Sequence, residues 1–86
     1  MYTLLQIVIY LQSVDSSSIT LLNHYNTLKQ CENKINQTYK RNIEGGITVK
    51  RLKDNDNKIF LKISTPELQA ITYWHCKKAI FFEAVK

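Results

Sequence analysis

Glycine and proline are scarce in this sequence, with 2 glycines and 1 proline among 86 residues. So little glycine excludes a glycine-rich phosphate loop, and the G-x-S-x-G turn of α/β-hydrolases is absent as well. A long apolar run is also missing. The stretch TLLQIVIYL at residues 3–11 spans nine residues, far short of the ~20 that a transmembrane helix needs. We therefore expect no membrane span and no phosphate-loop chemistry.

Acidic residues are few, 7 against 12 lysines and arginines, which gives a formal net charge of +5. No carboxylates are paired as general acid–base catalysis would require. Residues 1–28 carry one charged side chain, Asp15, whereas every Lys and Arg lies between Lys29 and Lys86. Such an excess permits contact with nucleic acid, an anionic membrane or an acidic protein, and it also keeps a small protein soluble.

The overall composition, 44% apolar and 22% charged, is that of a globular protein. A chain of this length has room for a single domain, residues 1–86. Abundant Ile, Asn, Lys and Tyr are typical of an AT-rich genome, such as that of a phage, a virus or an AT-rich bacterium. No Lys or Arg precedes the apolar stretch and no A-x-A cleavage signature follows it, so the cytoplasm of a host cell is favoured over export.

Residues 2–12 alternate with the period of a β-strand. Leu5, Ile7 and Ile9 fall on one fully apolar face, and the other face is amphipathic. This pattern predicts a central strand with a helix packed against the Leu5, Ile7 and Ile9 side. Residues 15–18 form a loop, and residues 19–25 fit either a short strand or the start of a helix.

A helix is predicted from Thr27 to about Asn42. Thr27 and Gln30 have the spacing of a capping box, in which each side chain bonds to a free amide of the first turn. Apolar residues then recur every three or four positions and form one stripe: Leu28, Cys31, Ile35 and Tyr39.

Residues 47–53 and 58–64 form a hairpin around Asp54-Asn55-Asp56-Asn57. Its inner face contains Ile47, Val49, Ile59, Leu61 and Ile63, whereas Lys50, Lys62 and Lys53 point outward. Ser64-Thr65-Pro66-Glu67 is a helix-start signal. Residues 71–76 and 79–85 suit strands, with Lys77-Lys78 as a turn, although a helix at 71–76 stays open.

Together these elements predict an α+β fold. An antiparallel sheet of three to five strands carries one long helix on one face, and a short second helix follows Pro66. The expected core consists of residues from the first strand, the helix and the hairpin: Leu5, Ile7, Ile9, Leu28, Ile35, Val49, Leu61 and Ile63.

Two cysteines, Cys31 and Cys76, are the only redox-active residues. Cys31 lies on the inward stripe of the helix. If residues 71–76 form a strand, Cys76 shares a face with Trp74, which suggests that the cysteines are neighbours. A disulfide bond and two buried thiols both remain open. The set His24, Cys31, His75 and Cys76 lacks zinc-site spacing, and Asp54-x-Asp56 suits a turn better than a calcium loop, so no metal or other cofactor is predicted.

One set of residues suits contact with a partner. It combines the lysines and arginine of the hairpin with nearby aromatic and basic residues: Lys50, Arg51, Lys53, Lys58, Lys62, Tyr73, Trp74, Lys77 and Lys78. Cations that neutralise phosphates beside aromatic rings that stack on bases would suit single-stranded nucleic acid, and the same charges would suit an acidic partner. Lysines on an edge hairpin also prevent sheets from joining edge to edge.

The segments MYTLLQIVIYL, YNTLKQC and TYWHC occur in this order along the chain. In this outline the sequence resembles small uncharacterised two-cysteine proteins encoded by phages of marine bacteria, from which it departs in its long basic hairpin. The resemblance implies a viral context and a bond between Cys31 and Cys76. We expect a non-enzymatic accessory domain that binds a protein partner. The alternative is a single-stranded nucleic-acid binder that uses the 47–63 hairpin and nearby aromatics.

Overall fold

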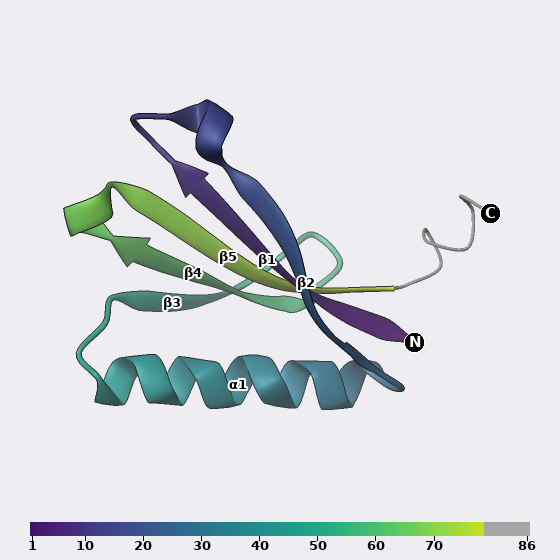
Figure 1. Ribbon diagram of the computed structural model, residues 1–86. Helices are drawn as coiled ribbons and strands as arrows, with labels where there is room; N and C mark the ends of the chain where they lie inside the picture. Colours follow the sequence, from purple (N-terminus) through teal and green to yellow (C-terminus); the bar gives the residue numbers. More distant parts are fainter. Residues whose placement is uncertain (79–86) are drawn as a thin grey trace.

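A computed structural model describes residues 1–78 of the chain (Figure 1). It has the predicted α+β fold, in which one antiparallel sheet of five strands carries one long helix. The strands are β1 (Tyr2–Tyr10), β2 (Ser18–Tyr25), β3 (Val49–Lys53), β4 (Ile59–Thr65) and β5 (Ala70–Lys78), in the spatial order β2-β1-β5-β4-β3. The helix is α1 (Leu28–Glu44), and it connects the two edge strands. The strand predicted at 79–85 lies outside the described residues.

Strand β1 lies between β2 and β5, as its alternating pattern predicted. The segments left open, 19–25 and 71–76, are both strand. The turn predicted at Lys77-Lys78 is wrong, because both residues continue β5 in register with β1. The short second helix after Pro66 is a single 3-10 turn, η2 (Pro66–Leu68). It ends at Gln69, whose φ of 48° lies in the left-handed region and turns the chain into β5.

The start of α1 has the predicted capping box. The Thr27 hydroxyl accepts a hydrogen bond of 3.2 Å from the Gln30 amide, and the Gln30 side-chain oxygen accepts one of 3.4 Å from the Thr27 amide. The helix ends at Glu44, two residues beyond the predicted end at Asn42. Gly46, with a φ of 75°, then leads the chain toward β3.

The core lies between α1 and one face of the sheet. Its fully buried side chains come from the helix (Cys31 and Ile35) and from the centre of the sheet (Leu4 and Leu61), all at most 1% exposed. Tyr2, Leu28, Val49, Ile59 and Trp74 pack around them.

The prediction that α1 covers Leu5, Ile7 and Ile9 is wrong. These residues alternate with Leu4 along β1 and therefore lie on the opposite face of the sheet. The physical reason is the register between strands. Leu4 is paired with Cys76 on β5, and Cys76 points at the helix, so Leu4 and its even-numbered neighbours face α1. The alternating pattern of β1 does not by itself predict how β1 pairs with β5.

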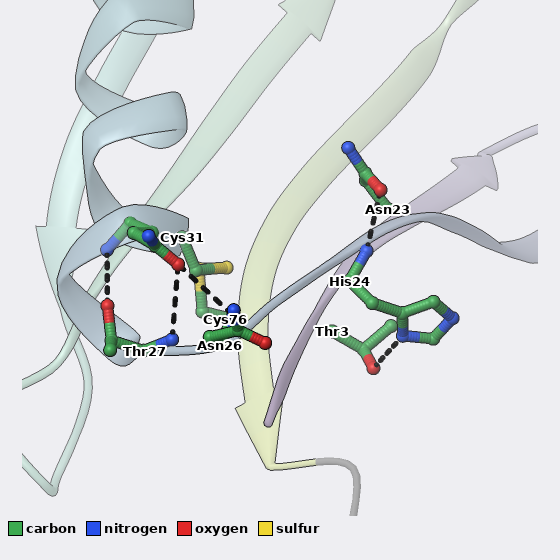
Figure 2. The surroundings of a disulfide bond; sticks show 8 residues. Thr3, Asn23, His24, Asn26, Thr27, Cys31 and Cys76 are labelled. Carbon is green, nitrogen blue, oxygen red and sulfur yellow. Dashed lines mark hydrogen bonds between the residues drawn. A yellow bond between two sulfur atoms is a disulfide. The ribbon is translucent and has the colours of Figure 1, made fainter.

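A disulfide bond joins α1 to β5 (Figure 2). The sulfur atoms of Cys31 and Cys76 are 2.06 Å apart and the Cα atoms 6.1 Å, which confirms that the cysteines are neighbours. Both are buried, at 0% and 7% exposure. The bond therefore fixes the first turns of the helix over the central strand of the sheet.

Candidate functional site

The face of the sheet opposite α1 is the candidate site. Within residues 1–78, no helix lies against it (Figure 1). Strand pairing assigns to this uncovered face the following side chains: Thr3, Leu5, Ile7 and Ile9 on β1; Ile19, Leu21 and His24 on β2; Lys50 and Leu52 on β3; Phe60, Lys62 and Ser64 on β4; Ile71, Tyr73, His75 and Lys77 on β5. Thr3 is buried at the end of this face, where its hydroxyl lies 2.8 Å from His24 Nδ1.

Most of these side chains are apolar. The three on the edge strands are the most exposed: Ile19 at 68%, Leu21 at 48% and Leu52 at 38%. Those on the inner strands, such as Ile7 and Phe60, are half-buried because they pack against one another across the sheet. Large contiguous apolar patches on a protein surface mark sites of contact with another molecule.

Three rings form a cluster at the centre of the uncovered face. Phe60 on β4 stacks on His75 on β5, with centroids 4.6 Å apart and planes at 12°. The Tyr73 ring centroid lies 6.3 Å from each of them. Adjacent strands are ~4.8 Å apart, so rings stacked across them at this distance must stand on edge above the sheet. Each of the two rings, Phe60 and His75, therefore covers one face of the other.

The environment of His75 favours its neutral form. Burial is the main effect that lowers the pKa of His75 from its usual 6.5, and the positive charge of Lys77 lowers it further, while Asp54 acts in the opposite direction. A neutral imidazole stacked on Phe60 adds to the apolar character of the face.

The charged side chains that the strands place on the uncovered face are all basic. Lys50 and Lys62 are paired directly across β3 and β4, in the same row as Tyr73 and Ile7. Lys77 lies further along β5. No strand of the described chain contains Asp or Glu. The face is therefore apolar and has three cationic side chains. Lys50 and Lys62 share one row, whereas Lys77 lies further along the central strand, where Asp54 of the hairpin turn acts on it.

The remaining members of the predicted contact set lie elsewhere. The Arg51 side chain points toward α1, where its guanidinium donates to the Asn36 side-chain oxygen at 2.9 Å and lies 4.8 Å from the centre of the Tyr39 ring. Trp74 packs against the core and has its Nε1 buried without a hydrogen-bond partner among residues 1–78. Lys58 lies beside Tyr2, 6.0 Å from the ring centre.

Pairing also assigns Lys53 and Lys78 to the helix side, because Lys53 is opposite Ile59 and Lys78 is opposite Tyr2. The prediction that Lys53 points outward with Lys50 and Lys62 is wrong, since Lys50 and Lys53 have opposite parity along β3. The nine predicted residues therefore do not form one surface. Lys50, Lys62, Tyr73 and Lys77 share a face.

The residues considered for metal binding have other contacts. Cys31 and Cys76 are bonded to each other, His75 stacks on Phe60, and His24 Nδ1 lies 2.8 Å from the Thr3 hydroxyl (Figure 2). In the part of the chain that the structure describes, no three His, Cys, Asp or Glu side chains come together as metal ligands would.

The Asp54 segment is a turn, as the sequence indicated. One Asp54 carboxylate oxygen accepts hydrogen bonds from the amides of Asp56 and Lys58, at 2.9 and 3.0 Å. The pKa of Asp54 is lowered, mainly by the hydrogen bond from the Lys58 amide. Desolvation opposes this effect, and the hydrogen bond from the Asp56 amide adds to it. The carboxylate therefore holds the hairpin turn closed.

An open hollow of about 510 Å³ lies beside the end of β1. Its lining residues are Tyr10, Gln12, Ser13, Ser16 and Leu68, and the Ser13 and Ser16 hydroxyls lie 3.0 Å from each other. No His, Cys, Lys or carboxylate belongs to this set, so neither serine has a general base within it.

Comparison with protein-family models, with curated proteins and with solved structures finds no match to this chain. None of the helices within residues 1–78 has both the length and the apolar character that crossing a membrane requires. The site is therefore interpreted from its own geometry.

Sequence reasoning missed Phe60, His75, Ile19 and Leu21 as surface residues. A signal was present in residues 59–63, where Phe60 interrupts an inward row of Ile59, Leu61 and Ile63. An aromatic residue between three inward aliphatic residues indicates a strand with apolar side chains on both faces. The same is true of residues 4–9 in β1.

Proposed function

We propose that this chain is a non-enzymatic accessory domain, encoded by a phage or a virus, that acts by binding a protein partner through the uncovered face of its sheet. The supporting observation is the row of apolar side chains across all five strands, of which Ile19, Leu21 and Leu52 are 68%, 48% and 38% exposed. Burying apolar surface is worth about 25 cal/mol per Å², so covering this face would favour binding.

The charges on the face support an acidic partner. Lys50, Lys62 and Lys77 lie beside the apolar rows. The strands contain no Asp or Glu, and Asp54 of the hairpin turn is the carboxylate that acts on Lys77 and His75, so Lys50 and Lys62 are the cations most available to a partner. A matching surface has an apolar stripe flanked by Asp or Glu, as in an acidic amphipathic helix. Complementary charge of this kind accelerates association and excludes basic partners.

Binding to single-stranded nucleic acid is the second candidate, because Lys50, Lys62 and Tyr73 share one row of the uncovered face. Three observations favour a protein instead. Phe60 and His75 stack on each other, which occupies ring faces that bases would need. Trp74 and Arg51 contact the helix side of the molecule.

The test uses a synthetic amphipathic peptide with Leu at helical spacing and Glu between, together with a counterpart in which Lys replaces every Glu. Titration at low salt should show the chain binding the acidic peptide at least tenfold more tightly, since ~0.5 kcal/mol from each of three lysines amounts to about a factor of ten. The variant Lys50→Glu should reduce this preference to about twofold, because it removes one attraction of ~0.5 kcal/mol and adds one repulsion of similar size. It also removes the like charges of the Lys50–Lys62 pair, so it should fold normally.

Lys53→Glu is the matched control, because it makes the same charge change on the same strand but on the opposite face. Equal losses for Lys50→Glu and Lys53→Glu would contradict a face-specific site. An oligo(dT) titration in parallel tests the second candidate. Nucleic acid would be favoured if the chain bound oligo(dT) with a steep dependence on salt, if Lys50→Glu lost that binding, and if the native chain showed no preference for the acidic peptide.

A further inference from the structure

Among residues 1–78, no strand pairs with the outer edge of β2. β2 is paired with β1 on one side only and ends the sheet. Its eight residues, SITLLNHY, include no Lys, Arg, Asp, Glu or Pro. Ile19, Leu21 and Leu22 on this strand are 68%, 48% and 38% exposed.

The other edge of the sheet differs in each of these respects. Strand β3 has five residues, and three of them are Lys50, Arg51 and Lys53. Soluble proteins protect edge strands by shortening them and by adding charges, because free backbone N–H and C=O groups otherwise recruit another strand. β3 has both devices, whereas β2 has neither. The pairing of β2 with β1 contains one irregularity, between Leu4 and Leu5, and Ser18 to Leu21 keep a regular register that a further strand could extend.

We propose that β2 pairs antiparallel with β2 of a second copy of this chain. The chain has a net charge of +5, but residues 1–28 contain no Lys or Arg and only one acidic residue, Asp15. Two copies can therefore approach along β2 without bringing lysines together. Pairing through β3 would bring together two strands with three cations each. A β2–β3 contact would be heterologous and would continue into an open fibre, whereas β2–β2 contact closes after two copies.

The geometry of this pairing extends the candidate site. Antiparallel strands of identical copies are related by a two-fold axis perpendicular to the sheet, so both copies of α1 lie on the same side. The two uncovered faces then join into one surface, with Ile19 and Leu21 of each copy at the seam. The dimer does not depend on the proposed function, because it follows from the edge and not from the face.

Sedimentation velocity over a range of concentrations tests the proposal. The native chain should sediment as a dimer, and hydrogen exchange of the β2 amides should slow as concentration rises. Thr20→Lys should weaken dimerisation at least tenfold, since it introduces one cation per copy at the seam. The Thr20 side chain is in register with Gln6 and lies on the helix side, so the uncovered face keeps its composition.

Leu52→Lys adds the same cation at the opposite edge of the sheet, on the uncovered face, and should leave the dimer intact. Circular dichroism and an intact disulfide bond would establish that both variants are folded. A native chain that remains monomeric at every concentration would overturn the proposal. A dimer that Leu52→Lys disrupts and Thr20→Lys does not would overturn it too, because association would then use β3 or the uncovered face.

Discussion

The bond between Cys31 and Cys76 should provide a large part of the stability of this domain. It closes a loop with a sequence separation of 45 residues. In the chain-entropy description, a loop of this length restricts the unfolded chain by about 4 kcal/mol at 25 °C. Small domains have a total free energy of unfolding of only ~5 to 15 kcal/mol. Removal of the bond should therefore unfold a substantial fraction of the molecules or bring them close to unfolding.

Urea unfolding of the oxidised protein, the reduced protein and the double variant Cys31→Ala/Cys76→Ala measures this contribution. With a slope near 1 kcal/mol per molar urea for a chain of this size, the midpoint should fall by roughly 3 to 4 M on reduction. The double variant should match the reduced protein and should not respond to reductant. A loss below ~1 kcal/mol would refute the reasoning, because it would mean that the unfolded chain is already restricted without the bond.

Three further results are expected. Leu61→Ala should cost about 3 kcal/mol in urea unfolding and Ile7→Ala less than half as much, because Leu61 is 0% exposed beneath α1 and Ile7 lies on the uncovered face; equal costs would contradict this assignment. Thr27→Ala should cost ~1 kcal/mol through loss of the cap, and Thr27→Ser should restore it. The pKa of His75 is lowered in the folded state. The free energy of unfolding should therefore be unaffected by His75 above pH 6.5 and should fall as the pH drops from 6.5 toward the pKa of His75 in the folded protein, by at most ~1.4 kcal/mol per pH unit. A His75→Gln variant with the same pH profile would exclude this cause.

Local patterns predicted much of the fold. The capping box at Thr27 and Gln30 placed the start of α1, since that signal depends only on residues three positions apart. The hairpin turn at Asp54 was similarly readable, because its hydrogen bonds form within four residues. The approach of Cys31 and Cys76 followed from helical and strand periodicities that each direct a cysteine inward. In each case the contacts form between residues close in sequence, or the side chain's direction follows from the periodicity of a single helix or strand.

The candidate site was less predictable because it depends on register between distant strands. In a strand with apolar residues on both faces, periodicity identifies two faces but does not determine which one the helix covers. For β1 that choice depends on the pairing of Leu4 with Cys76, across 72 positions of sequence. The basic contact set is divided between the two faces for the same reason. Lys50 and Arg51 are adjacent in sequence and belong to opposite faces.

The apolar side chains of the uncovered face need an explanation outside the fold. Within residues 1–78, the one long helix covers a single face of the five-stranded sheet. The disulfide bond contributes about 4 kcal/mol, comparable to the burial of two large aliphatic side chains at 1.5 to 3 kcal/mol each. The helix side and this bond thus supply the stability that a second layer would otherwise provide. Polar residues at the exposed positions Ile19 and Leu21 would then cost the fold little and would improve solubility. Their apolar character is best explained by contact with another molecule, and this is what the acidic-peptide and sedimentation experiments measure.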